Sequence, residues 1–173
     1  MRLFVAFNFN DRTRGGLLAL RDELRSGAGR GSFTLPENLH LTLVFLGECD
    51  MRQASSAKAA MDAVRFEPFD LTIGRVGRFG GRDGGAIWWA GVCVDEPLSE
   101  LHRALTDNLA GAGFTLDKRK FSPHITLGRK VVTDAAPRRV EPFGEEVRKI
   151  DLMKSERIEG RLTYTPIHTV ESV

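Results

Sequence analysis

The sequence contains little of what would place this protein in several common classes. Only two of its 173 residues are cysteines, Cys49 and Cys93, and they form no CxxC motif. This usage is typical of reduced thiols in an intracellular protein and argues against a zinc site. No stretch approaches the roughly 20 apolar residues that a membrane span needs. The formal net charge of +2 is too small to indicate nucleic-acid binding by itself. We therefore expect a cytoplasmic protein without a membrane segment.

Two familiar catalytic motifs are also missing. The glycines between Gly74 and Gly85 are followed by no Gly-Lys-Ser/Thr sequence, so they predict no phosphate-binding loop. No nucleophile-elbow sequence surrounds Ser32, Ser55, Ser99 or Ser122, which argues against a serine hydrolase.

The composition and periodicity predict one globular α+β domain. Hydrophobic residues make up 42% of the chain and charged residues 28%, which is typical of a folded protein. Asp11 is the expected N-cap of a first helix that ends at residues 27–31, and a leucine stripe on residues 98–109 predicts a third helix. We expect a second helix at 52–64, strands at 3–9, 39–46, 69–79, 86–95, 122–130, 147–155 and 161–170, a hairpin loop at 80–85, and a loop containing Pro137 and Pro142.

One four-residue phrase occurs twice, as His40-Leu41-Thr42-Leu43 and as HITL at residues 124–127. Its alternation of polar and apolar residues has the period of a half-buried strand. Each histidine should therefore share a face with the threonine two residues later, while the apolar residues face the core. The copies are about half the chain apart, each after a strand and a helix, which indicates an internal duplication. We expect a bilobal fold of two pseudo-symmetric lobes, each an antiparallel sheet flanked by helices, with both motifs lining the cleft between them.

Two histidines and two threonines are suited to splitting a phosphodiester. A lone strand histidine is usually structural, but two copies with the same neighbours favour a shared function. Imidazole has an unperturbed pKa of about 6.5, so one ring can act as a base while the other acts as an acid. The threonine hydroxyls are hydrogen-bond donors for the phosphoryl oxygens. The pattern therefore predicts a catalytic pair, His40 and His124, and two phosphate-binding residues, Thr42 and Thr126.

The sequence around both motifs resembles the 2H phosphoesterase superfamily. The matching segments are PENLHLTLVFLG at residues 36–47 and FSPHITLGR at residues 121–129. Within the superfamily the chain is most similar to the LigT-like RNA 2′,3′-cyclic phosphodiesterases, also called RNA 2′-5′ ligases. Weaker similarity runs nearly end to end, through MRLFVA at 1–6, WAGV at 89–92, LMKS at 152–155, Gly160 and Tyr164.

This resemblance implies a single domain over residues 1–173, built of two intertwined lobes, without a metal or nucleotide cofactor. It implies hydrolysis of a terminal 2′,3′-cyclic phosphate to a 2′-phosphate, on RNA ends or cyclic nucleotides. In this chain His40 would protonate the leaving 3′-oxygen and His124 would activate the water. Thr42 and Thr126 would hold the non-bridging oxygens.

Other polar and aromatic residues are weaker candidates. Arg119, Lys120 and Arg129 flank the second motif and are possible contacts to the RNA backbone, and Arg78 and Arg82 near the hairpin are lesser ones. For the adjacent tryptophans 88 and 89, only one can face the cleft, and core packing is favoured over base stacking. The remaining histidines, 102 and 168, have no matching neighbour and are expected to be structural or solvent-facing.

Two alternatives to a hydrolase remain open. A non-catalytic module that binds RNA ends would use the same cleft, although arginine or lysine would serve pure binding better than histidine. A 2′-5′ RNA ligase or 2′-5′ phosphodiesterase would use the same residues, because hydrolysis and ligation share one transition state. The oligomeric state expected for either enzyme is a monomer.

Overall fold

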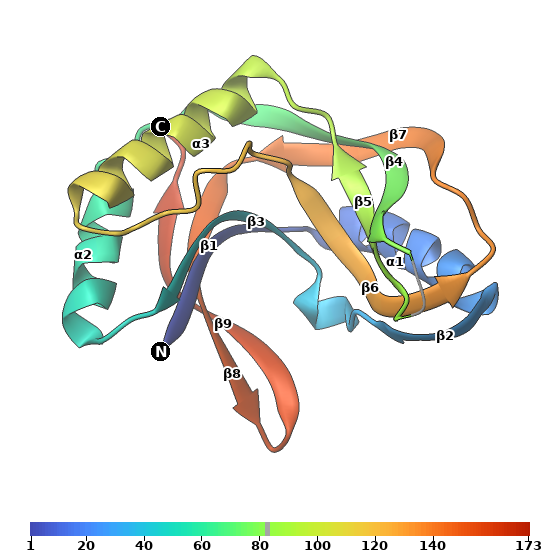
Figure 1. Cartoon of the computed structure of the whole chain (residues 1–173). Coiled ribbons are helices and arrows are strands. Elements are labelled where there is room, and N and C mark those ends of the chain that lie inside the picture. The colour runs from blue at the N-terminus through green and yellow to red at the C-terminus, as the bar shows by residue number, and fades with distance from the viewer. Residues whose placement is uncertain (82–83) are drawn as a thin grey trace.

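The computed structural model describes residues 1–81 and 84–173, so Arg82 lies outside the described residues (Figure 1). Among the described residues, no helix is both long and apolar enough to cross a membrane. The elements, in chain order, are β1 (Arg2–Asn8), α1 (Asp11–Ser26), β2 (Ala28–Phe33), a 3₁₀ turn η1 (Pro36–Asn38), β3 (His40–Glu48), α2 (Met51–Asp62), β4 (Phe69–Gly80), β5 (Ala86–Val92), α3 (Glu96–Gly111), β6 (His124–Thr133), β7 (Arg138–Val147), β8 (Lys149–Ile158) and β9 (Arg161–Glu171).

The described strands form two antiparallel sheets, which confirms the predicted α+β class. Sheet A has the strand order β3-β1-β8-β9, and sheet B has the order β2-β6-β5-β4-β7. The histidine strand β3 lies beside β1 in sheet A, and the histidine strand β6 lies beside β5 in sheet B. An α-helix lies between the two strands of each pair in the sequence, α1 in the first pair and α3 in the second. The orders β3-β1-β8-β9 and β6-β5-β4-β7 therefore correspond. Sheet A takes β8 and β9 from the C-terminal end, so the two sheets are not simply the two halves of the sequence.

One continuous apolar core contains residues of both sheets and all three described α-helices. Helix α1 packs on β2, β6 and β7, whereas α3 packs on β3 and β4, and α2 lies against α3 and β9 (Figure 1). The predicted leucine stripe of α3 is confirmed, because Leu98, Leu101, Leu105 and Leu109 are all buried. The motif residues Leu41 and Ile125 also enter this core. The opposite face of each sheet is therefore left for the polar motif residues.

The first helix begins one residue away from its predicted cap. Asn10, and not Asp11, is the N-cap: its backbone is extended and its side-chain oxygen accepts a hydrogen bond from Thr13 N at 2.8 Å. Asp11 is instead the first helical residue, where a carboxylate interacts favourably with the positive end of the helix dipole. The prediction was wrong because two adjacent residues could both act as caps.

Two segments that were predicted to be loops are strands. Residues 28–33 form β2 and residues 138–147 form β7, and both are edge strands of sheet B. An edge strand tolerates glycine and proline because one side of its backbone needs no partner. Pro142 lies where the β4–β7 register shifts, between the pairs Ile73↔Phe143 and Arg75↔Arg139. The missing proline N–H therefore costs no ladder bond at this position.

Candidate active site

The two repeated motifs occupy matched positions in the two sheets. His40 and His124 are the first residues of β3 and β6, and the two strands contact each other. In both strands the histidine and the threonine are half-buried, and the intervening apolar residues are buried. The predicted alternation is thus confirmed. We call the side that carries histidine and threonine the histidine face of each sheet.

A register shift follows each motif at the same place. In sheet A, Val5 pairs with Val44 but Ala6 pairs with Thr42, so Leu43 is an extra residue in β3. In sheet B, Trp88 pairs with Gly128 but Trp89 pairs with Thr126, so the equivalent extra residue is leucine 127. Such β-bulges shift the alternation of the side chains that follow.

The bulges bring one further side chain to each histidine face. Phe45 and Arg129 each lie five residues after a motif histidine and are exposed, Phe45 to 65%. The Phe45 ring lies 6.2 Å from that of Phe4, which in turn lies 5.0 Å from the ring of His40. Phe4 thus lies between the exposed Phe45 ring and the first histidine, and an arginine occupies the position equivalent to Phe45 after the second histidine.

Both histidine rings are held by the same backbone contact. His40 Nδ1 donates to the Asn38 carbonyl and His124 Nδ1 donates to the Ser122 carbonyl, each at 2.8 Å. Because a carbonyl only accepts, these contacts assign the proton of the neutral ring to Nδ1 and leave Nε2 as the basic nitrogen. His40 Nε2 accepts from Thr42 Oγ1 at 2.9 Å. Within the described part of the chain, His124 and Thr126 form no equivalent bond.

The electrostatic environment distinguishes the first histidine. Burial lowers the pKa of His40 below its usual value, and the positive charges of His124 and Arg129 lower it further, against the raising effect of the Asn38 carbonyl. Since His124 and Arg129 belong to the other sheet, the two motifs are close enough to interact electrostatically. The His40 ring is therefore mostly neutral near pH 7 in the absence of an anion.

Aromatic side chains lie beside both histidines. The ring of His40 is 5.0 Å from Tyr164 in an edge contact, and burial raises the pKa of Tyr164. The ring of His124 is 5.1 Å from Phe79 and 6.4 Å from Trp89. Only one of the adjacent tryptophans is on the histidine face, as predicted. Trp89 pairs with Thr126 there, whereas tryptophan 88 is buried in the core.

The first histidine strand is supported by the β8–β9 hairpin, which projects from the rest of the molecule (Figure 1). The buried side chain of Asn38 donates to the Leu162 carbonyl of β9 at 3.0 Å. Beside it, Glu37 and Arg161 form an ion pair. The residue whose carbonyl orients His40 is thereby attached to sheet A.

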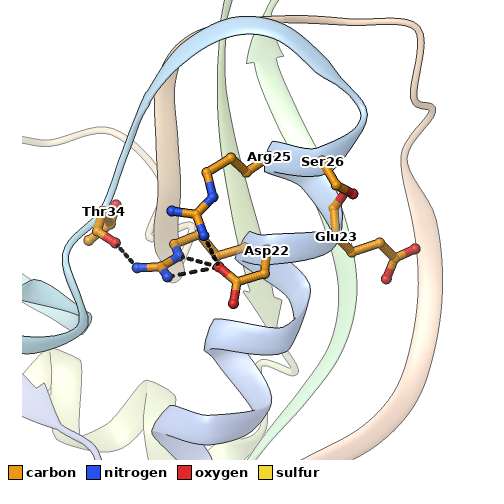
Figure 2. Close-up of polar contacts among 6 residues, drawn as sticks. Asp22, Glu23, Arg25, Ser26 and Thr34 are labelled. Carbon is orange, nitrogen blue, oxygen red and sulfur yellow. Dashed lines mark hydrogen bonds and ion pairs between the residues drawn. The ribbon is translucent and has the colours of Figure 1, made fainter.

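The second histidine strand is supported by helix α1 through Thr34. Arg21 Nη1 donates to the Thr34 carbonyl at 2.8 Å, and its other nitrogens bind Asp22 Oδ1 (Figure 2). Thr34 in turn donates to the carbonyls of Thr126 and Leu127, each at 2.9 Å. Arg21 was not among the predicted site residues, although it lies four residues after Leu17 on the buried helix face, a position that indicates a partnered arginine.

The candidate RNA contacts are not equivalent. Arg119 is held by Asp117, with Nη2 and Oδ2 2.6 Å apart, and the pKa of that carboxyl is lowered by the contact. Lys120 is exposed in the segment between α3 and β6. Arg129 alone of these lies near His40. Arg78 lies over the core tryptophan Trp88, at 5.9 Å, on the face of sheet B opposite to His124.

The other two histidines contact neither motif. His102 stacks on Phe121 with ring centroids 3.8 Å apart, and His168 Nε2 lies 2.7 Å from Asp62 Oδ1. In the described ranges, no group of three or more histidine, cysteine, aspartate or glutamate side chains is arranged to hold a metal ion.

Comparisons with known proteins point to one family. The family model described as the 2′-5′ RNA ligase superfamily matches residues 19–159. A protein of Archaeoglobus fulgidus named RNA 2′,3′-cyclic phosphodiesterase is 34% identical over 90% of this chain and 91% of its own. A Thermotoga maritima protein of the same name is 33% identical over 75% of this chain and 70% of its own. The crystal structure of Escherichia coli LigT complexed with 3′-AMP is similar with a TM-score of 0.83, at 27% identity, over 99% of this chain and 97% of that one.

Proposed function

Because this chain belongs to the 2′-5′ RNA ligase superfamily, we propose that it is an RNA 2′,3′-cyclic phosphodiesterase that hydrolyses a terminal cyclic phosphate to a 2′-phosphate. The observation that carries the proposal is the matched pair of His-x-Thr motifs on two contacting strands, each with a basic Nε2. The name of the Archaeoglobus fulgidus relative, which is similar over nine-tenths of both chains, supports the same substrate class. The shared core supports a single domain over residues 1–173.

Each histidine carries out one of the two proton transfers of the reaction. His124 Nε2 takes a proton from water, the water oxygen attacks phosphorus, and the bond from phosphorus to the 3′-oxygen breaks. His40 Nε2 gives its proton to that 3′-oxygen, so the products are a 2′-phosphate and a free 3′-hydroxyl. Each proton transfer of this kind typically contributes about 10²–10⁴-fold in rate.

The contact between His40 and Thr42 couples protonation to phosphate binding. In the neutral ring, Nε2 accepts the Thr42 hydroxyl proton at 2.9 Å. When His40 Nε2 is protonated it can no longer accept this proton, so the Thr42 hydroxyl is free to donate to a phosphoryl oxygen. Thr126 supplies the corresponding donor from sheet B, in keeping with the matched strands.

His40 acts as the acid only when it is protonated, and its lowered pKa works against this in the free protein. The positive charge of Arg129, and that of His124 whenever its ring is protonated, are part of the cause. An anionic phosphate bound between these groups offsets their repulsion and raises the pKa of His40. Substrate binding thus supplies the protonation state that catalysis requires.

Two exposed side chains complete the proposed substrate contacts. Arg129 binds the phosphate, because a guanidinium is suited to planar contacts with phosphate oxygens. Phe45 offers an exposed ring next to Phe4, which contacts His40, and the base of the terminal nucleotide stacks on the Phe45 ring. We place the weaker contacts, Arg119 and Lys120, outside this set, because they lie in the segment before the second motif.

Turnover by histidine variants tests the proposal against a pure RNA-end binding module. His40→Ala and His124→Ala should each lower kcat by about 10²–10⁴-fold on a 2′,3′-cyclic nucleotide, while both variants still bind the product. The double variant should lose much less than the product of the two losses, because the residues act as a unit. A wild-type protein that binds cyclic ends without hydrolysing them would favour the binding module. Ligation by the same residues is tested by adding a second RNA strand with a 5′-hydroxyl end to the cyclic-ended strand and looking for a joined product.

A further inference from the structure

A second cluster of side chains extends the histidine face of sheet B away from His124. Trp89 lies over Gly77, where an added Cβ would be 2.4 Å from the indole ring. The guanidinium of Arg75 lies over the same indole, 5.0 Å from its centroid. The ring of Phe79 lies 5.2 Å from Trp89 and is 40% exposed. The strand register places Arg75 opposite Gly91 and Gly91 opposite His124, so Arg75 and His124 share one face.

The cluster has the chemistry of a single-stranded nucleic-acid contact. Arg75 is exposed and forms no ion pair within the described residues, so its charge is available to an anion. Its guanidinium is held over Trp89 by a cation–π contact, which limits the ordering cost of binding. Single-stranded RNA is recognised by cations that follow the backbone and by aromatic rings that stack on bases. Arg75 and Phe79 supply one of each.

The two sheets differ in what they offer beyond their histidines. In sheet A, the rings of Phe4 and Tyr164 pack with Met153 into a small apolar cluster, and the exposed side chain is Phe45. Arg2, two residues before Phe4 on β1, is an exposed cation close enough to Tyr164 to influence its pKa, but it is stacked on no aromatic ring among the described residues. In sheet B, the cluster includes Arg75, and it begins at Phe79, 5.1 Å from His124. Sheet B therefore offers a cation stacked on an aromatic ring next to its histidine, which favours sheet B as the site of the next phosphate.

We propose that Arg75, Phe79 and Trp89 form a subsite for the nucleotide that precedes the cyclic end. Arg75 binds the phosphate that joins the last two nucleotides, and Phe79 stacks on the preceding base. This rests on the proposed function, and it names the substrate as an RNA strand in preference to a free cyclic nucleotide.

The test compares 2′,3′-cyclic AMP with a short oligoribonucleotide that ends in the same cyclic adenosine. Arg75→Gln keeps part of the side-chain stem over Trp89 and removes the charge. It should lower kcat/KM for the oligonucleotide relative to cyclic AMP by about 10- to 100-fold, the effect of one lost bond to a charged group. Phe79→Leu keeps an apolar side chain against His124 and should also lower this ratio.

Arg78→Gln is the matched control. Arg78 is three residues from Arg75 on the same strand and also lies over a tryptophan, but on the opposite face of sheet B. This variant should leave kcat/KM unchanged for both substrates. Salt provides a second measurement that a purely structural role would not change. Arg75→Gln should reduce the log–log salt slope of oligonucleotide kcat/KM by about 0.7, the value for one phosphate contact on a single strand, and Arg78→Gln should not.

Three results would overturn the subsite: an unchanged substrate ratio in Arg75→Gln, an unchanged salt slope in that variant, or an equal loss in Arg78→Gln. Failure of the proposed function is distinguishable, because the wild-type protein would then hydrolyse neither substrate. In that event the subsite is still tested by fluorescence anisotropy with an oligonucleotide that ends in a 2′-phosphate. Arg75→Gln should bind it about 10- to 100-fold more weakly than either the wild type or Arg78→Gln.

Discussion

The carbonyl oxygen of Asn38 accepts a hydrogen bond from His40 Nδ1 at 2.8 Å, and the side chain of Asn38 is itself fixed by its bond to the Leu162 carbonyl. Asn38 is only 7% exposed, so this amide joins strand β9 to the ring of His40 through buried atoms. The carbonyl that holds His124 belongs to the exposed Ser122. The two histidines thus have the same ring contact but different supports.

Asn38→Ala should lower both activity and stability. It leaves the Leu162 carbonyl without its donor, which costs about 1–3 kcal/mol of unfolding free energy. It also frees the backbone that orients His40, and a misplaced catalytic group lowers kcat by about 10- to 100-fold. Asn108→Ala is the control, because Asn108 makes a similar bond to the Ala60 carbonyl in the helical layer. Urea unfolding and steady-state kinetics measure both effects, and equal kcat values in the two variants would contradict the positioning role.

Arg21→Met should destabilise the protein more than Arg25→Met does, because Arg21 is buried on α1 and Arg25 is exposed. Arg21 binds the Thr34 carbonyl, and Thr34 holds the strand that carries Thr126. Its loss should cost about 1.5–3 kcal/mol, the range for hydrogen bonds to a charged group. Arg25 pairs with the same carboxylate at the surface, so Arg25→Met should cost less than about 1 kcal/mol. Similar losses in the two variants would show that the contact through Thr34 contributes little.

Acidification should destabilise the fold through two histidines. Burial lowers the pKa of both His40 and His102. Between the lowered pKa values and about 6.5, the unfolded chain binds more protons at these rings than the folded chain does. Their contribution to stability is therefore fully present above about pH 6.5 and is lost as the pH falls through the lowered values. Unfolding free energies measured from about pH 7.5 to pH 5 should fall, and less steeply in His102→Gln. An identical pH slope in that variant would exclude His102 as a cause.

The pH dependence of kcat/KM should be bell-shaped, because one imidazole must be neutral and the other charged. The apparent midpoints belong to the coupled pair. One of them should lie below about 6.5, since the pKa of His40 is lowered in the free protein. Steady-state assays over about pH 5–9 measure this profile. A flat profile would show that the imidazoles do not limit the reaction.

The sequence predicted the polar and apolar faces of both motifs because strand alternation is a local property. It did not predict the bulges. Simple alternation from His40 places Val44 on the histidine face, whereas the extra residue at Leu43 places Phe45 there. Such register shifts depend on the neighbouring strand, which local periodicity does not contain. For the same reason, the charge of Arg129 and its closeness in sequence to His124 predicted an RNA contact, but they did not indicate that Arg129 lies near His40.

The remaining differences also arise from tertiary structure. The glycine-rich segment that forms β2 and the proline-containing segment that forms β7 have weak strand signals, and pairing at the edges of sheet B determines their conformation. Arg21 and Asn38 have partners 13 and 124 residues away in sequence, Thr34 and Leu162. Residue type and spacing predicted the catalytic pair, but the groups that position it depend on how the chain folds back.

The proposed function requires that His40 and His124 together cleave the bond to the 3′-oxygen without a metal. The most direct test is ³¹P NMR of the product formed from a 2′,3′-cyclic nucleotide in excess EDTA. The wild-type protein should give only the 2′-phosphate monoester, while His40→Ala and His124→Ala, both folded, should leave the cyclic phosphate essentially intact over the same time. A 3′-phosphate product, loss of activity in EDTA with recovery on adding a divalent ion, or full activity in either alanine variant would contradict it.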